Sequence, residues 1–121
     1  MRLVFDLTVS TSAPYEARAV VDTLEHDLVP ETLGDLRMVI SELVANAVKY
    51  GSGSPIHVEL EVVAPDRVHG EVADRGDPDR APRVVERPGS EGGFGLRIVD
   101  ALATAWGVHE GSTHVWFALG D

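Results

Sequence analysis

Apolar and polar residues alternate along several stretches of the chain, and this period of two predicts β-strands with one buried face. In the first stretch, Leu3, Phe5 and Leu7 alternate with polar neighbours. Pro65 and Asp66 separate two later stretches of the same kind, which predicts a β-hairpin. We expect strands at residues 2–9, 55–64, 67–74, 107–111 and 113–120.

Apolar residues recur at helical spacing in three other stretches. The first helix is expected to begin after a capping Thr11 or Ser12, with Pro14 in its first turn, and to run as far as Pro30. The second should run from about residue 31 to residue 50, where the segment GSGSP ends it. The third is expected at 94–106. The core stripe of the second helix should consist of Leu33, Leu36, Ile40, Leu43, Val44 and Ala47.

The predicted order is strand, helix, helix, two strands, long loop, helix and two strands. Because each element has only one apolar face or stripe, the simplest packing is an α+β two-layer sandwich. It would have three helices on one face of a mixed, mostly antiparallel sheet. Residues 75–93 are rich in proline, glycine and charge and have no periodicity, which is typical of a functional or disordered loop. Residues 1–121 are expected to form a single domain.

Composition excludes several classes of function. The net charge of −10 disfavours binding to nucleic acids and anionic membranes. The chain has no cysteine, which excludes disulfides, thiol catalysis and zinc–thiolate sites. Its five histidines are scattered without the spacing of metal ligands. No apolar run could span a bilayer, and the first residues lack the apolar region of a signal peptide, so we expect a cytoplasmic protein.

The segment SELVANAVKYG, residues 41–51, places two polar side chains on the flank of a helix. Glu42 and Asn46 are one turn apart, about 40° around the axis at 100° per residue. A carboxamide oxygen is a suitable ligand for Mg²⁺, and a nearby carboxylate can accept a proton from water or a hydroxyl. On spacing alone, two residues on the solvent edge of the helix remain the simpler interpretation.

The segment VADRGDP ends a predicted strand with Asp74 and has Gly76 two residues later. A carboxylate at the end of a strand can accept a hydrogen bond from an exocyclic amino group such as that of adenine. A glycine lets a flat ring approach the backbone closely. An ordinary Asp–Gly turn would have the same sequence.

The segment EGGFGLRIVDAL places Gly92, Gly93 and Gly95 directly before a predicted helix. Unpaired amide N–H groups and the positive end of the helix dipole favour phosphate binding there. The segment is neither a dinucleotide-binding fingerprint, because Ile98 replaces the third glycine, nor a Walker A loop, because it has no Gly-Lys-Ser/Thr. A flexible loop joined to a helix is the alternative.

The order and separation of these motifs resemble the GHKL family of ATP-binding domains, which includes DNA gyrase, histidine kinases and MutL. Within that family, the sequence is most similar to the small anti-sigma factor serine/threonine kinases. SELVANAVKYG resembles their N box, VADRGDP their G1 box, and GGFGLRIVDALATAWGV their G2 box. STHVWFAL resembles their last strand. The resemblance covers essentially the whole chain and implies a Bergerat-type ATP-binding fold.

The resemblance implies roles for particular residues. Asn46 would be the Mg²⁺ ligand, and Glu42 would be the general base. Asp74 would bind the adenine amino group, with Gly76 beside the ring. Residues 77–91 would form the lid over ATP. The remaining nucleotide contacts would come from Gly93, Gly95, Leu96 and Thr113.

Three positions leave alternatives open. A shift of one residue would place Ser112 or His114, instead of Thr113, beside adenine. Lys49, one turn beyond Asn46, is close enough in sequence to reach a phosphate, although a surface lysine is the simpler interpretation. Asp77 stands near the place where the family has a second glycine after Gly76, so lid and adenine contacts are expected to differ there.

The resemblance implies a function in transcription regulation with ATP and Mg²⁺ as cofactors. The protein would bind a sigma factor and phosphorylate a serine or threonine of a small, STAS-type anti-sigma factor antagonist. The sequence leaves the oligomeric state open, although related kinases commonly form homodimers. One alternative is a non-catalytic module whose partner affinity follows its nucleotide state. Another is a stand-alone catalytic domain of a histidine kinase.

Overall fold

A computed structural model of the chain describes residues 1–51, 55–74, 96–108 and 114–120. The strands are β1 (Arg2–Leu7), β2 (Ile56–Ala64), β3 (Arg67–Ala73), β4 (Ala105–Val108) and β5 (Val115–Leu119). The α-helices are α1 (Ala13–Val21), α2 (Pro30–Tyr50) and α3 (Arg97–Leu102), and a short 3₁₀ helix, η1 (Asp22–Leu24), follows α1. Within these ranges, none of the helices has the length and hydropathy needed to span a membrane.

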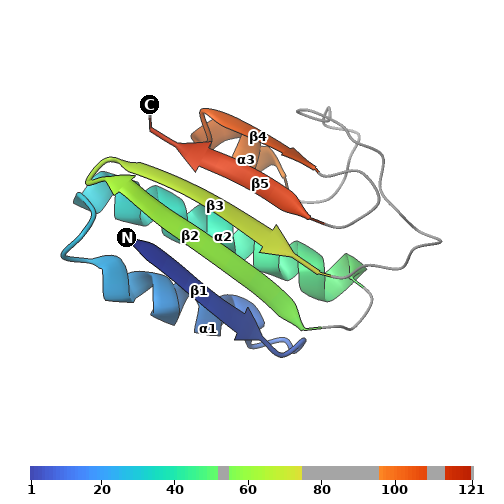
Figure 1. Cartoon of the computed structure of the whole chain (residues 1–121). Helices are drawn as coiled ribbons and strands as arrows, with labels where there is room; N and C mark the ends of the chain where they lie inside the picture. Colours follow the sequence, from blue (N-terminus) through green and yellow to red (C-terminus); the bar gives the residue numbers. More distant parts are fainter. Residues whose placement is uncertain (52–54, 75–95, 109–113, 121) are drawn as a thin grey trace.

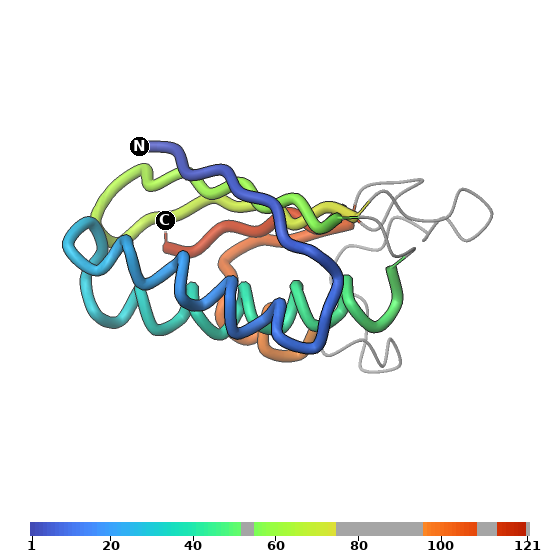
Figure 2. The backbone as a smooth tube through the Cα atoms, turned by 90° about the horizontal axis from the view of Figure 1, so that it is seen from below, coloured from blue at the N-terminus to red at the C-terminus, as the bar shows by residue number. Residues whose placement is uncertain are grey.

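The five strands form one sheet in the order β1-β2-β3-β5-β4 (Figure 1). All four pairings between described strands are antiparallel. The three α-helices lie together on one face of this sheet, which Figure 2 shows from the edge. The α+β two-layer sandwich expected from the hydrophobic pattern is therefore confirmed. The predicted hairpin is also present, with Pro65 and Asp66 between β2 and β3.

The core lies between the sheet and α2, the longest helix. Every second residue of β2 from Ile56 to Leu60 is buried, as the alternation predicts. The stripe of α2 is also confirmed, because five of its six members are buried and Leu33 packs against them at the edge. Burial of this stripe fixes the rotation of α2 about its axis, and this rotation decides where its polar flank points.

The third helix is shorter than the sequence predicts. It ends at Leu102 rather than at residue 106, and Ala103 is extended with ψ of 140°. Thr104 then bonds to the last strand, since its backbone N–H and its hydroxyl both donate to the carbonyl oxygen of Ala118, at 2.9 Å and 3.1 Å. Trp106, only 2% exposed, is buried in β4 opposite Phe117. Pairing with β5 therefore overrides the helical spacing of this segment, and β4 begins at Ala105 rather than at 107.

The first helix begins where the sequence predicts but ends earlier. Ser12 occupies the N-cap position, but its hydroxyl makes no capping bond and instead pairs with the hydroxyl of Ser10 at 2.9 Å. The α-helix ends at Val21, and η1 continues the chain to Leu24. Leu24 and Leu28, whose spacing suggested a longer helix, are nevertheless buried in the core.

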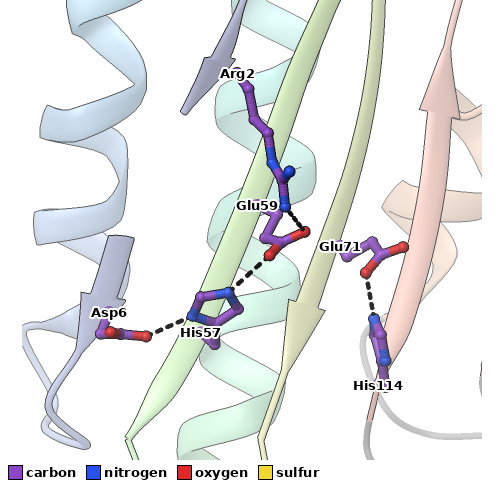
Figure 3. A network of polar contacts seen from close by, with 6 residues as sticks. All are labelled: Arg2, Asp6, His57, Glu59, Glu71 and His114. Carbon is purple, nitrogen blue, oxygen red and sulfur yellow. Dashed lines mark hydrogen bonds and ion pairs between the residues drawn. The ribbon is translucent and has the colours of Figure 1, made fainter. Parts of the chain in front are cut away.

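A polar network crosses the helix-free face of the sheet (Figure 3). His57 lies between two carboxylates, with Nδ1 at 2.6 Å from Asp6 and Nε2 at 3.1 Å from Glu59. Arg2 pairs with the other oxygen of Glu59 at 3.0 Å. Because both ring nitrogens face carboxylates, the imidazolium form satisfies both bonds. The hydrogen bond to Glu59, followed by that to Asp6, raises the pKa of His57, and the hydrogen bond from His57 lowers the pKa of Glu59.

These two shifts predict a window of pH in which the network stabilises the fold. The His57 contribution is fully present below its unfolded pKa of 6.5 and is lost as the pH rises through its higher folded pKa. The Glu59 contribution is present above its unfolded pKa of 4.5 and is lost as the pH falls through its lower folded pKa. The network should therefore stabilise the fold most between pH 4.5 and 6.5.

We expect His57→Gln to destabilise the protein within this window, and the loss should shrink as the pH rises through the folded pKa of His57, which lies above 6.5. The His57 side chain is 41% exposed, so the loss should be no more than about 1 kcal/mol. Urea denaturation at a series of pH values measures it. His69→Gln, at an exposed position on the same face of the sheet, is the matched control. A loss for His57→Gln that does not change with pH would contradict the charged bridge.

Candidate functional site

Helix α2 carries Glu42 and Asn46 at the border between its buried stripe and its exposed surface. Both residues are half-buried, whereas Ala45 between them is exposed. Glu42 shares one groove with Ile98 of α3, so this flank of α2 faces α3. Glu42 therefore lies at the boundary between α2 and α3, and Asn46, one turn further along α2, is half-buried.

Asp74 directly follows β3 and is only 2% exposed. Its carboxylate lies against Gly51, the residue that ends α2, because a β-carbon at Gly51 would collide with that carboxylate. Gly51 is five residues beyond Asn46, or roughly 7.5 Å along the helix axis at 1.5 Å per residue. The fold thus brings Asp74 to the same end of α2 as Asn46, although 28 positions separate them in sequence.

Leu96 is the first residue described after the glycine segment. It occupies the N-cap position of α3, and its carbonyl oxygen accepts a hydrogen bond from the N–H of Asp100 at 2.9 Å. Its side chain packs against the core. The remaining predicted nucleotide contacts lie outside the described residues, namely Gly76, Gly93, Gly95, Thr113 and the lid at 77–91.

Two of the open alternatives involve described residues. His114 pairs with Glu71 at 2.8 Å on the helix-free face of the sheet (Figure 3), whereas Asp74 faces the end of α2. The His114 side chain therefore lies on the face opposite the candidate site. Lys49 is exposed, and its ammonium lies 5.2 Å from the centre of the Tyr50 ring. Contact between Lys49 and a phosphate stays a prediction.

Gly51 is a residue whose importance the sequence alone did not reveal. Its place in GSGSP indicated only the end of a helix, but its lack of a side chain is what lets Asp74 reach the helix end. The hydrogen bond from Arg18 to Ser41, at 2.6 Å, was also missed. It joins residues 23 positions apart and lies directly beside Glu42. No local pattern could have indicated either contact.

Gly51→Ala is expected to displace the Asp74 carboxylate and to weaken nucleotide binding. The added β-carbon would collide with both Asp74 and the carbonyl oxygen of Ala47, and overpacking of this kind costs about 1–3 kcal/mol. Thermal denaturation and ATP titration measure the two effects. The matched control is Gly34→Ala, because a β-carbon there meets nothing within 4 Å and should stabilise the helix. Unchanged ATP affinity in Gly51→Ala would contradict a role for Asp74 in the site.

The molecule is a two-layer sandwich whose longest helix carries Glu42 and Asn46 and has a buried Asp74 against its end. This is the arrangement expected of a GHKL-type ATP-binding domain. The comparison with family models agrees with this class. The chain belongs to the histidine kinase-like ATPase domain family, whose model matches residues 10–119. Membership of this family supports ATP as the ligand.

One solved structure with the same fold contains the RsbU and RsbW domains of Rv1364c from Mycobacterium tuberculosis. The superposition has a TM-score of 0.70 at 22% sequence identity and covers 98% of this chain. The chain spans only 31% of the length of that protein. No curated protein sequence matches the chain. At 22% sequence identity, this likeness establishes the fold of the chain and nothing beyond it.

Proposed function

We propose that this protein is an anti-sigma factor with Mg·ATP-dependent serine/threonine kinase activity. The observation that carries the proposal is the half-buried flank of α2, where Glu42 and Asn46 lie one turn apart on the helix whose end contacts the buried Asp74. An ATP-binding module needs a group that recognises adenine, and it needs a ligand for the metal ion. A kinase needs, in addition, a group that receives a proton, and Glu42 supplies it.

The described residues fit a metal ion that binds together with nucleotide. The described residues contain no group of three or more His, Cys, Asp or Glu side chains that could hold a metal ion in the absence of nucleotide. Mg²⁺ at phosphate-transfer sites usually has one or two protein oxygens and completes its coordination with phosphates and water. The carboxamide oxygen of Asn46 would be such a ligand. When bound, Mg²⁺ would neutralise charge on the phosphates.

In the proposed reaction, Glu42 accepts the proton of a serine or threonine hydroxyl on the acceptor protein. The hydroxyl oxygen forms a bond to the γ-phosphorus as the bond between that phosphorus and the β–γ bridging oxygen breaks, and ADP leaves. Asp74 accepts a hydrogen bond from the adenine amino group and fixes the position of the base. In the proposal, Leu96, Gly93 and Gly95 hold the phosphates, and Gly76 and Thr113 contact adenine.

The proposed partners are a sigma factor and a STAS-type antagonist, which would be the phosphate acceptor. The likeness to a protein that contains an RsbW domain supports a partner-switching system of this kind. The net charge of −10 supports action through protein partners rather than on nucleic acid or anionic membranes. A cytoplasmic location is part of the proposal. A homodimer is part of the proposal.

Labelled ATP tests the kinase directly. Purified protein is incubated with γ-labelled ATP, Mg²⁺ and a panel of purified STAS-type antagonist domains, and phosphoamino acids are analysed. We expect label on serine or threonine of at least one antagonist. Failure to label any of them, with ATP bound, would favour a module that binds partners without phosphotransfer. Asp77, which stands where the family has a glycine, is the feature that favours this second function.

A further inference from the structure

Helix α3 directly follows Leu96, a proposed phosphate contact, yet the helix itself buries little. Of its six residues, all within the described part of the chain, only Val99 is buried, whereas seven residues of α2 are. A helix of this length is not stable without tertiary contacts. The position of α3, and with it that of Leu96, therefore depends strongly on the polar bonds that join the helix to the sheet.

Asp100 of α3 makes a side-chain bond to the edge of the sheet. Its Oδ1 accepts a hydrogen bond at 3.0 Å from the indole N–H of Trp106, which belongs to β4. Trp106 is only 2% exposed and packs in the hydrophobic core, whereas Asp100 is exposed. A close-packed core holds a buried ring in one place. An exposed residue of a short helix is thus joined to a side chain that cannot shift without repacking the core.

The backbone of Asp100 holds the proposed phosphate contact. Its N–H donates to the carbonyl oxygen of Leu96 at 2.9 Å. Two hydrogen bonds in series therefore connect the indole of Trp106 to the backbone of Leu96 through a single residue. Beyond the other end of α3, the hydroxyl of Thr104 donates to the carbonyl oxygen of Ala118 in β5. The helix is anchored in this way to both strands at that edge of the sheet.

The bond between Asp100 and Trp106 has a purely structural use as well, because a buried indole N–H without an acceptor costs free energy. Any neutral acceptor would serve that use. Here the acceptor is a carboxylate, which forms the stronger, charge-assisted kind of hydrogen bond. It also comes from the residue whose own N–H holds Leu96. Both features favour a bond that fixes the start of α3.

We propose that Asp100 is a positioning residue for the phosphates of ATP. Through its bonds to Trp106 and Leu96, it holds the start of α3 where the phosphates bind. This inference rests on the proposed function, because only that function places Leu96 against phosphate. Asp100 contacts neither the nucleotide nor the acceptor protein. Its influence is confined to the phosphates, since the proposed adenine contact, Asp74, follows β3 and lies against the end of α2.

Ligands with different numbers of phosphates separate positioning from general stability. Asp100→Ala should weaken ATP binding by at least about fivefold, as expected for one hydrogen bond, and leave adenosine binding unchanged. Asp100→Asn still offers an oxygen acceptor and should restore ATP affinity. Trp106→Phe keeps an aromatic ring without the donor and should match Asp100→Ala. The double variant should be no weaker than either single one. Calorimetry with ATP and NMR titration with adenosine, both with Mg²⁺, measure the affinities.

The unmodified protein offers a second test, because the chain has two tryptophans and hence two indole N–H signals in its NMR spectrum. The Trp106 signal should move when ATP is added and stay in place with adenosine. Trp116 lines a groove on the helix-free face of the sheet, so its signal should stay in place with both ligands. Trp116→Phe assigns the two signals. It is also the matched control for Trp106→Phe and should leave ATP affinity unchanged.

The outcomes distinguish this inference from the proposed function. Equal losses of ATP and adenosine affinity in Asp100→Ala would make Asp100 a structural residue and overturn the inference. Unchanged ATP affinity in Asp100→Ala, no recovery in Asp100→Asn, or a Trp106 signal that ignores ATP would overturn it too. Failure of the unmodified protein to bind ATP would overturn the inference and the proposed function together. The expected losses without phosphotransfer to any antagonist would overturn the kinase alone.

Discussion

Glu42→Gln is expected to abolish phosphotransfer while ATP remains bound. The change removes the proposed acceptor of the hydroxyl proton but keeps the size of the side chain on the flank of α2. Loss of a general base typically reduces the rate of a proton-transfer step by about 10²–10⁴-fold. Single-turnover transfer from γ-labelled ATP to an antagonist domain measures the rate, and calorimetry measures ATP affinity.

Glu31→Gln is the matched control for this prediction, because Glu31 is an exposed residue in the first turn of the same helix. It should transfer phosphate at the rate of the unmodified protein. Transfer by Glu42→Gln at that same rate would exclude Glu42 as the base. If transfer were lost together with ATP binding, Glu42 would instead be a residue of the nucleotide site.

Asn46→Ala should weaken Mg·ATP binding by about 10–100-fold and have a much smaller effect on metal-free ATP. The reason is that the proposed contact of Asn46 is with the metal and not with the nucleotide. Calorimetric titrations with Mg²⁺ and with a chelator compare the two losses. Asn46→Asp keeps an oxygen ligand at the same place and should retain the dependence on Mg²⁺. Equal losses under both conditions would mean that Asn46 does not contact the metal.

Hydrophobic periodicity correctly predicted the elements that bury one face of a strand or one stripe of a helix. The stripe of α2 from Leu36 to Ala47 and the alternation in β2 are buried as expected. The segment that contains Thr104 and Trp106 was predicted wrongly, because its backbone pairs with β5 and its indole is buried there. That pairing depends on a strand that begins nine residues after Trp106, and a helical period within the segment cannot reveal it.

The candidate site was predictable where it depends on one element and unpredictable where it depends on two. The turn of helix between Glu42 and Asn46 follows from sequence alone, and the structure adds that Glu42 shares a groove with Ile98 of α3. The burial of Asp74 against Gly51 depends on how β3 packs on the end of α2. The bond between Arg18 and Ser41 depends on how α1 packs on α2. These contacts arise from tertiary packing, which no motif encodes locally.

In the proposed complex, a metal-bound triphosphate lies between the α2 flank and the start of α3. A crystal structure of the protein with a non-hydrolysable ATP analogue and Mn²⁺, whose anomalous signal locates the metal, tests it most directly. We expect the metal against the carboxamide oxygen of Asn46, the γ-phosphate facing Glu42, and the adenine amino group against Asp74. Nucleotide density at another place, or a metal that does not contact Asn46, would contradict the account.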